Sequence, residues 1–208
     1  VWTSMKRAGF EADKKDLILF NRKSGVTKNL TEDFEKSVDE FVWTPDSKTI
    51  YFLAANEIYS SIYKLDVNSG DAELFYKENF NTNLQLSKDG KTLFFLKQRT
   101  DLPSEIFSLS TDGKNSLRRI TFTNEEILSQ LEMNPVETFW CEGASGDKVQ
   151  SILIKPPFFD PNKKYPMMFL IHGGPQGAWE DNFHYRWNLQ MFAGAGYVVI
   201  APNPRGST

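Results

Sequence analysis

A repeat of about 43 to 45 residues constrains the fold of the first half of this chain more than any other feature. Residues 46–52 (DSKTIYF) match residues 89–95 (DGKTLFF), 43 positions further on. In both segments a polar turn that contains Asp leads into an apolar and aromatic strand. The next strands also match, because residues 62–66 (IYKLD) are followed 44 positions later by residues 106–110 (IFSLS).

The repeat predicts β-propeller blades. An earlier partial copy of the repeat lies at residues 17–21. Each copy continues to a polar turn, at residues 23–25, 68–70 and 111–113. Each turn precedes a short outer strand, at residues 28–31, 72–75 and 118–121. Several short strands in a unit of this length are typical of a propeller blade. We therefore predict two full blades and part of a third over residues 1–122, with unrelated hairpins as the alternative. Because propellers usually have four to eight blades, exposed strand edges are expected.

Composition narrows the possible classes of function. The 208 residues are 40% hydrophobic and 25% charged, which favours a folded globular protein, and the net charge of −3 does not favour nucleic acid or an anionic membrane surface. The single cysteine, Cys141, excludes an internal disulfide and a cysteine metal cluster, and we expect it to be a small buried residue. No apolar run approaches the roughly 18 residues of a membrane span. Because Val1 does not look like a natural start, we interpret the chain as a piece of a longer protein.

The segment after the repeat predicts a connector and a hairpin. Thr123 and Glu126 have the spacing of a capping box, so a short helix is expected at about residues 124–131. Residues 137–141 and 149–154 flank a polar turn and predict a β-hairpin. We place the connector at residues 123–136 and a second domain at residues 137–208.

The apolar run at residues 168–171 stops at His172-Gly173-Gly174-Pro175, which predicts a buried strand that ends in a glycine loop. In an α/β-hydrolase, the loop after the third strand supplies a backbone N–H to the oxyanion hole. Glycine suits this position because a backbone without Cβ atoms can approach the developing oxyanion to about 3 Å.

A βαβ unit follows the glycine loop. Trp187, Met191 and Phe192 fit one face of a helix, and Gly194 and Gly196 are helix stop signals. The β-branched run at residues 197–200 predicts the next strand. Strand, helix and strand in this order imply parallel pairing with a right-handed crossover. The predicted fold is therefore a set of all-β propeller blades followed by the N-terminal part of an α/β-hydrolase domain.

One long loop, residues 5–15, carries the charged residues Arg7, Glu11 and Asp13. One interpretation is a solvated loop between blades. The sharper interpretation is that Glu11 or Asp13 faces a cavity and meets the amino terminus of a substrate, which charge complementarity permits.

The order of these features resembles the prolyl oligopeptidase family of serine peptidases, and within it the dipeptidyl-peptidase and acylaminoacyl-peptidase branch. The resemblance rests on residues 163–175 (KKYPMMFLIHGGP) and 196–208 (GYVVIAPNPRGST) behind the propeller repeats. It implies a propeller that covers an α/β-hydrolase domain and filters substrates. It also implies hydrolysis of short peptides through an acyl-enzyme, by Ser, Asp and His in that chain order, without a cofactor or metal.

The resemblance assigns roles to the glycine loop but not to a triad. The N–H of Gly174 would be one oxyanion donor, with Gly173 and Pro175 shaping the loop and His172 holding it by hydrogen bonds. No G-x-S-x-G is present, because residues 143–147 (GASGD) lack the final glycine and Ser207 lies outside such a pattern. We therefore expect the triad beyond Thr208 and no activity from these residues alone. His184 is expected at the surface or in packing, and Arg205 in a structural ion pair.

Two other functions stay open. A non-catalytic propeller module that binds a partner would need no triad, but it does not explain the glycine loop and the βαβ unit. An esterase or lipase could use the same loop, but it needs no propeller. The expected partners are a peptide substrate and the remainder of the same chain, possibly with a second copy in a homo-oligomer. The choice between exopeptidase and endopeptidase is open, and the periplasm is favoured over the cytoplasm because similar bacterial enzymes are often periplasmic.

Overall fold

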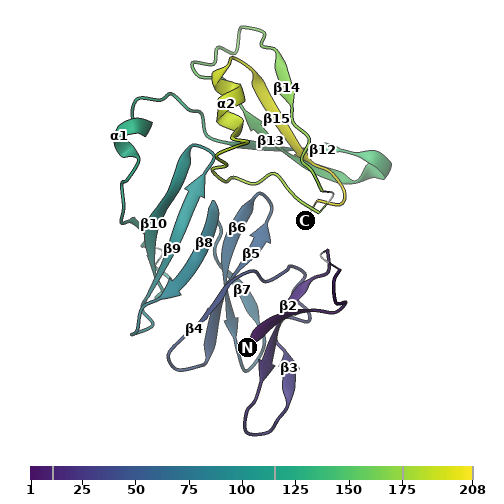
Figure 1. The fold of residues 1–208 in the computed structure, drawn as a ribbon, viewed down its shortest axis with the longest axis vertical. Helices are drawn as coiled ribbons and strands as arrows, with labels where there is room; N and C mark the ends of the chain where they lie inside the picture. Colours follow the sequence, from purple (N-terminus) through teal and green to yellow (C-terminus); the bar gives the residue numbers. More distant parts are fainter. Residues whose placement is uncertain (11, 115, 175, 208) are drawn as a thin grey trace. The chain divides into compact units, whose positions relative to one another are not determined.

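The fold is known from a computed structural model that describes residues 1–10, 12–114, 116–174 and 176–207 (Figure 1). The chain divides into two compact units, each of which is described by itself. Unit 1 consists of Val1–Leu96 and Ile106–Ile120, and unit 2 of Lys97–Glu105 and Thr121–Thr208. Among the described residues, no helix is long and apolar enough to cross a membrane.

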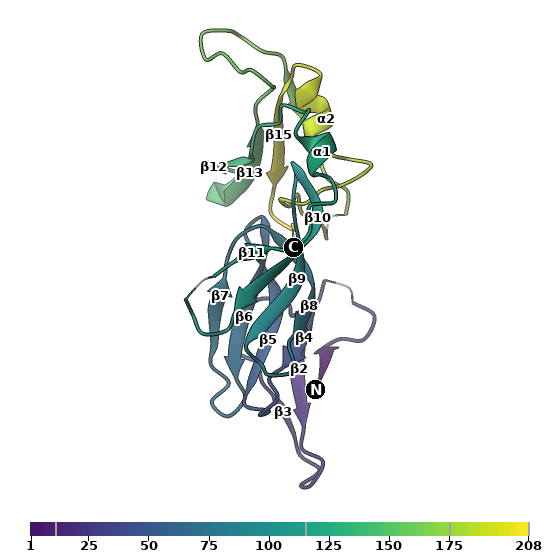
Figure 2. The ribbon, with the colours of Figure 1, turned by 90° about the vertical axis from the view of Figure 1, so that its left-hand side faces the viewer.

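The first half of the chain consists of β-meanders. The strands are β1 (Trp2–Met5), β2 (Lys15–Phe20), β3 (Thr27–Asn29), β4 (Phe41–Trp43), β5 (Thr49–Asn56), β6 (Tyr59–Asp66), β7 (Ala72–Tyr76), β8 (Phe80–Leu86), β9 (Thr92–Arg99), β10 (Leu102–Ser110) and β11 (Arg118–Arg119). Strands β1 to β3 form one sheet, and β4 to β7 run side by side as a second group (Figure 2). Strands β8 to β11 follow in sheet order and join β6 through the parallel pair Ser60 and Phe80. The predicted all-β character of this part of the chain is thus confirmed, and its division into two full blades and part of a third stays a prediction.

The two predicted full blades open with the same turn. In the first, the Thr44 hydroxyl donates to the Asp46 carboxylate at 2.7 Å, and the backbone N–H of Lys48 donates to it at 3.1 Å. In the second, the Ser87 hydroxyl and the Lys91 N–H bind Asp89 at 2.6 and 3.1 Å. In both turns the hydrogen bond from the hydroxyl is the largest cause, and the bond from the backbone N–H the second largest, of a lowered aspartate pKa. The repeated letters of the sequence therefore correspond to a repeated set of hydrogen bonds.

An aromatic cluster occupies the core of unit 1. Phe52 on β5 and Tyr63 on β6 are opposite each other, and their rings stack with centroids 5.4 Å apart. The ring of Phe34 meets both edge-on, at 5.2 and 5.1 Å. Leu17 of β2 and Leu30, which follows β3, are buried in the same cluster. The first sheet therefore packs on the first full blade through shared apolar side chains rather than through strand pairing.

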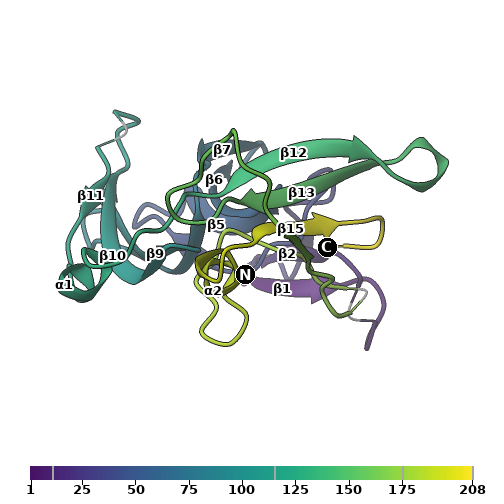
Figure 3. The same cartoon turned by 90° about the horizontal axis from the view of Figure 1, so that it is seen from above.

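The described residues of unit 2 form a four-stranded sheet and two short α-helices. Its elements are α1 (Glu125–Leu128), β12 (Glu137–Glu142), a 3₁₀ turn (Ala144–Gly146), β13 (Lys148–Ile154), β14 (Met167–Phe169), α2 (Leu189–Gly194) and β15 (Val198–Asn203). The sheet order is β12-β13-β15-β14, and Figure 3 shows β12, β13 and β15 side by side. β12 and β13 form the predicted hairpin, and β14 and β15 pair in parallel. The hairpin and the βαβ unit are therefore confirmed.

The predicted burial of the strand before the glycine loop was wrong. The apolar run at residues 168–171 was expected to form a buried strand, yet Phe169 and Ile171 are 51% and 77% exposed, and Met167 before it is 58% exposed. Met167 and Phe169 lie on one face of β14, an edge strand that pairs only with β15 in the described sheet, and Ile171 follows the strand by two residues. We call these three residues the apolar stripe. An apolar sequence shows that a strand is suited to burial, but not which layer of protein covers it.

The helices also differ from the prediction. The buried residues of α2 are Leu189, Gln190 and Ala193, whereas Met191 is exposed and Trp187 precedes the helix. The reason is the start of the helix, because the Asn188 side chain accepts from the N–H of Gln190 and so sets the first turn. Helix α1 ends three residues before the predicted end at residue 131, and no side-chain hydrogen bond caps it.

Cys141 is exposed, against the expectation of a buried position. It lies on β12, all six residues of which are exposed. β12 is an edge strand of the described sheet, where it pairs only with β13.

Candidate active site

The glycine loop (His172, Gly173 and Gly174) follows β14 after two further residues. Leu170 continues the strand, because its N–H donates to the carbonyl oxygen of Ile200 on β15 at 2.9 Å. Gly174 has a φ of +136°, and a Cβ atom built there would lie 2.6 Å from the backbone nitrogen of Gln176. Both facts require glycine at position 174. Pro175, the fourth residue of the predicted loop, lies outside the described residues.

Both ring nitrogens of His172 are engaged. Nδ1 lies 2.8 Å from the carbonyl oxygen of Gly173, and Nε2 lies 2.9 Å from Oγ of Ser207. A carbonyl oxygen only accepts, so in the neutral ring Nδ1 carries the proton and Nε2 accepts from the Ser207 hydroxyl. The bond to Ser207 ties the glycine loop to the segment that follows β15, and the bond to Gly173 lies within the loop. The supporting role of His172 in an oxyanion loop stays a prediction.

A second tie joins the same two segments. The Asn203 side chain accepts from the backbone N–H of Trp179 at 2.7 Å and donates to its carbonyl oxygen at 2.9 Å. The Trp179 indole N–H donates to the carbonyl oxygen of Leu170 at 3.1 Å. Trp179 is therefore fixed through its backbone by β15 and through its ring by the end of β14.

Arg205 and His184 take the structural places expected of them. The guanidinium of Arg205 forms an ion pair with Asp147 and donates to the carbonyl oxygen of Ala144 at 3.1 Å, so it holds the turn between β12 and β13. The exposed His184 accepts at Nδ1 from the N–H groups of Arg186 and Trp187, at 3.1 and 3.0 Å.

A cavity of about 430 Å³ lies beside the glycine loop. His172 and Gly173 line it together with the aromatic rings of Trp179 and Trp187 and the charged side chains of Glu180 and Arg186. An apolar wall with a few polar groups suits a small organic or peptide ligand. Among the described residues, no group of three or more His, Cys, Asp or Glu side chains is placed to hold a metal ion.

A buried polar network supports the segment between the loop and α2. Asp181 is 5% exposed and accepts from the N–H and the hydroxyl of Thr100, at 3.0 and 3.4 Å. Asn188 donates to the carbonyl oxygen of Thr100 at 3.1 Å, and the Gln98 side chain accepts from the N–H of Phe183, also at 3.1 Å. Sequence reasoning missed this network, because its partners lie 81 to 88 positions apart and show no local pattern.

The other predicted binding residues lie in unit 1. Asp13 accepts from the backbone N–H of Arg7 at 2.7 Å, inside its own loop, and the Arg7 guanidinium lies over the ring of Phe10. Glu11 lies outside the described residues. A role for either residue in binding a substrate's amino terminus stays a prediction.

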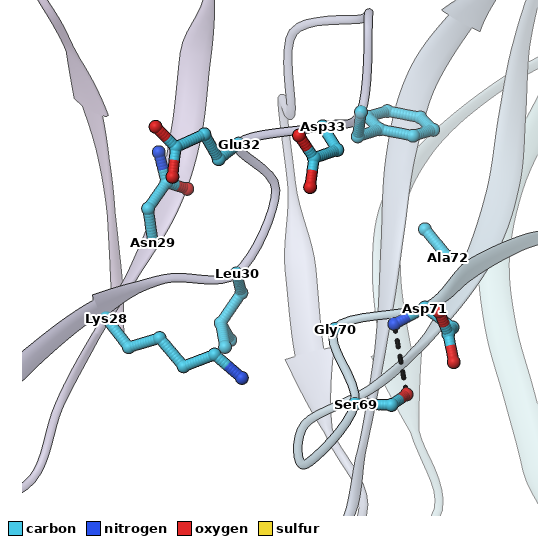
Figure 4. Close-up of a pocket in the computed structure, with 10 residues that line it drawn as sticks. Lys28, Asn29, Leu30, Glu32, Asp33, Ser69, Gly70, Asp71 and Ala72 are labelled. Atoms are coloured by element: carbon cyan, nitrogen blue, oxygen red, sulfur yellow. Dashed lines mark hydrogen bonds between the residues drawn. The ribbon is translucent and has the colours of Figure 1, made fainter.

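Unit 1 has a cavity of its own, of about 510 Å³ (Figure 4). Glu32 and Asp33 follow β3, and Ser69 and Asp71 belong to the turn before β7; all four line the cavity. Within this turn, the Asp71 N–H donates to the Ser69 hydroxyl at 3.1 Å. No residue predicted for a functional site lines this cavity.

The chain matches peptidases along almost its whole length. It is 30% identical to a dipeptidyl-peptidase 5 of Porphyromonas gingivalis over 205 residues, which are 99% of this chain and 30% of that protein. It is 32% identical to a dipeptidyl-peptidase 5 of Arthroderma otae over 212 residues, which span the chain and 29% of that protein. The chain thus spans about 30% of the length of the curated relatives it matches. No family model matches it.

Solved structures show the same fold. An acylaminoacyl peptidase in complex with Z-Gly-Gly-Phe-chloromethyl ketone superimposes with a TM-score of 0.77 at 22% identity, over 94% of this chain and 29% of that chain. The structure of Porphyromonas gingivalis dipeptidyl peptidase 4 superimposes with a TM-score of 0.67 at 20% identity, over 93% of this chain and 28% of that chain. The predicted order of propeller blades and the start of an α/β-hydrolase domain is thereby confirmed. The chain is thus similar in sequence to dipeptidyl peptidases and in fold to an acylaminoacyl peptidase, which confirms the predicted resemblance to the prolyl oligopeptidase family.

Proposed function

We propose that these residues are part of a serine peptidase that hydrolyses short peptides through an acyl-enzyme and releases dipeptides or acylated amino acids. The observation that carries the proposal is the glycine loop, where the φ of Gly174 and the contact its Cβ would make admit only glycine. The names of the relatives support the choice of peptide bonds as the substrate.

In this proposal the backbone N–H of Gly174 donates to the carbonyl oxygen of the scissile bond. The negative charge that develops on this oxygen is stabilised more than the neutral carbonyl, so the interaction lowers the barrier rather than only tightening binding. Gly173 and Pro175 shape the loop, and His172 supports it. The nucleophile, its base and the orienting acid are supplied by residues outside this segment, as is the second oxyanion donor.

The proposed division of labour follows the chain. Residues 1–122 are propeller blades that limit access of substrates, residues 123–136 connect, and residues 137–208 begin the peptidase domain. The cavity next to His172 and Gly173 would hold part of the substrate near the scissile bond. Glu11 or Asp13 of the propeller would meet the amino terminus of the peptide. Residues 1–208 alone would be inactive, because they lack the acyl-transfer nucleophile.

The test uses the full-length protein. Dipeptidyl anilides, acylaminoacyl anilides and simple 4-nitrophenyl esters are offered in parallel, and the protein is treated with a fluorophosphonate probe for serine hydrolases. Hydrolysis of an anilide together with uptake of one probe supports the proposal. Hydrolysis of esters alone identifies an esterase, and the absence of both hydrolysis and labelling identifies a binding module; either result refutes the peptidase. Residues 1–208 alone should take up no probe.

A further inference from the structure

We infer that Asn203 is a positioning residue for peptide hydrolysis, because its side chain fixes the far end of the segment that carries the glycine loop. The inference rests on the proposed function for the reaction itself. The hydrogen bonds that carry it are independent of that proposal.

Asn203 is held on a rigid element. It is the last residue of β15 and pairs with Gln150 on β13, so its backbone belongs to the interior of the described sheet. Its carbonyl oxygen Oδ1 and its amide nitrogen Nδ2 bind the N–H and the C=O of Trp179, at 2.7 and 2.9 Å. Because the amide uses its acceptor and its donor on the backbone of one residue, the side chain imitates the pair of hydrogen bonds that a neighbouring strand would make.

The pairing closes the loop that begins after β14. At its start, the Leu170 N–H binds β15 through Ile200 at 2.9 Å. At its end, Trp179 binds β15 through Asn203, and its indole N–H returns to the Leu170 carbonyl oxygen at 3.1 Å. Residues 171–178 are therefore clamped at both ends to one strand. The clamp also fixes the Trp179 ring as one wall of the cavity beside the glycine loop.

A second and weaker tie acts inside the loop. The Ser207 hydroxyl lies 2.9 Å from Nε2 of His172, directly before the two glycines. An oxyanion donor is effective only when it is held within about 0.5 Å of its productive place, and an error of about 1 Å can cost about a hundredfold in rate. Asn203 and Ser207 touch neither the scissile bond nor the nucleophile in this scheme. They act through the position of the loop, Asn203 with two hydrogen bonds and Ser207 with one.

Unit 2 offers a matched control. The Asn134 amide also donates to the backbone at two places, the carbonyl oxygens of Lys155 and Pro156, at 3.1 and 2.8 Å. Asn134 does not line the cavity beside the glycine loop. Loss of either amide therefore removes two side-chain–backbone hydrogen bonds from the same unit, but only Asn203 binds the segment that follows the loop.

The experiment compares Asn203→Ala, Asn203→Asp, Ser207→Ala and Asn134→Ala in the full-length protein, with a dipeptidyl anilide as substrate. Asn203→Ala should lower kcat roughly 10- to 100-fold with KM changed by no more than about threefold. Asn203→Asp should give a similar loss, because it replaces the donor to the Trp179 carbonyl by a charged oxygen. Ser207→Ala should lower kcat roughly 2- to 10-fold, and Asn134→Ala by less than about threefold.

Hydrogen exchange supplies a readout besides activity. The backbone amides of residues 170–174 and 176–179 should exchange faster in Asn203→Ala than in the wild type, and at the wild-type rate in Asn134→Ala. An unchanged kcat in a folded Asn203→Ala protein overturns the inference, as does an equal loss of kcat in Asn134→Ala. If Asn203→Ala does not fold, an unchanged kcat in both Asn203→Asp and Ser207→Ala overturns it. A wild-type protein that hydrolyses no anilide refutes the proposed function instead, and the exchange comparison still tests the clamp.

Discussion

A methyl group added to each glycine of the loop in turn tests the oxyanion assignment most directly. At Gly174, the new Cβ would lie 2.6 Å from the nitrogen of Gln176 and 3.3 Å from its carbonyl carbon, and φ is +136°. These neighbours are backbone atoms, so no side chain can rotate away to make room. At Gly173, the new Cβ would meet no atom within 4 Å, and φ lies outside the left-handed region.

The two substitutions therefore predict different losses. A residue other than glycine in such a backbone conformation costs of the order of 1–3 kcal/mol, and the loop can relieve this strain only by moving its backbone. Movement displaces the N–H of residue 174, and the loss of one oxyanion donor costs about 100- to 1,000-fold in kcat, or about 2.7–4 kcal/mol. Gly174→Ala should thus lower kcat at least about 100-fold. Gly173→Ala should leave kcat within about threefold and can change KM, because Gly173 lines the cavity.

The assay is steady-state hydrolysis of a dipeptidyl anilide by the full-length variants, with thermal unfolding as a check that each is folded. Labelling by the fluorophosphonate probe reports whether the nucleophile stays reachable. A folded Gly174→Ala protein that keeps its kcat would refute the assignment of this N–H to the oxyanion hole. Equal losses of kcat in both variants would refute the argument from backbone geometry.

Four further predictions concern stability and surface. Asp181→Ala removes the acceptor of a buried Thr100 N–H and should lower the free energy of unfolding by about 1–3 kcal/mol. Asp101→Ala breaks a partly exposed ion pair with Arg99 and should lower it by only about 0–1 kcal/mol. Chemical denaturation of the two full-length variants measures both losses. Phe52→Ala empties a fully buried site and should cost about 3–5 kcal/mol in the same assay. Hydrogen bonds from the Ser87 hydroxyl and from a backbone N–H lower the pKa of Asp89 in the folded protein. The wild type should therefore have a higher Tm than Asp89→Asn above about pH 4. This difference in Tm should vanish as the pH falls through the folded pKa of Asp89. The apolar stripe should make residues 1–208 alone bind a hydrophobic dye, and Phe169→Ser should reduce the signal.

The blades could be predicted from the sequence because their signal is local. A turn such as that of Asp46 or Asp89 is specified by hydroxyl, carboxylate and backbone groups within six consecutive residues. The same holds for the β12–β13 hairpin and for the order of β14, α2 and β15. In each case the letters that identify the element are also the groups that form its hydrogen bonds.

Burial could not be predicted with the same success. Phe169 lies in an apolar run and Met191 in an apolar helix, yet both are exposed, and the exposed Cys141 lies on an edge strand. Periodicity reports which side chains are suited to a covered face, but the cover itself comes from other parts of the molecule. The network around Asp181 was missed for a related reason, since its partner Thr100 is distant in sequence and neither residue is unusual in its own segment.

The segment after β15 shows what a short motif can and cannot reveal. From the sequence, residues 203–207 (NPRGS) support only a resemblance to a family. In the structure each polar residue of the segment has a different partner: Asn203 binds Trp179, Arg205 pairs with Asp147, and Ser207 binds His172. His172 is the first residue of the glycine loop, Trp179 follows the loop, and Asp147 lies in the hairpin turn. We therefore interpret the motif as a support that fixes the glycine loop to the sheet. In this interpretation the motif contributes to the reaction only by positioning the residues that it binds.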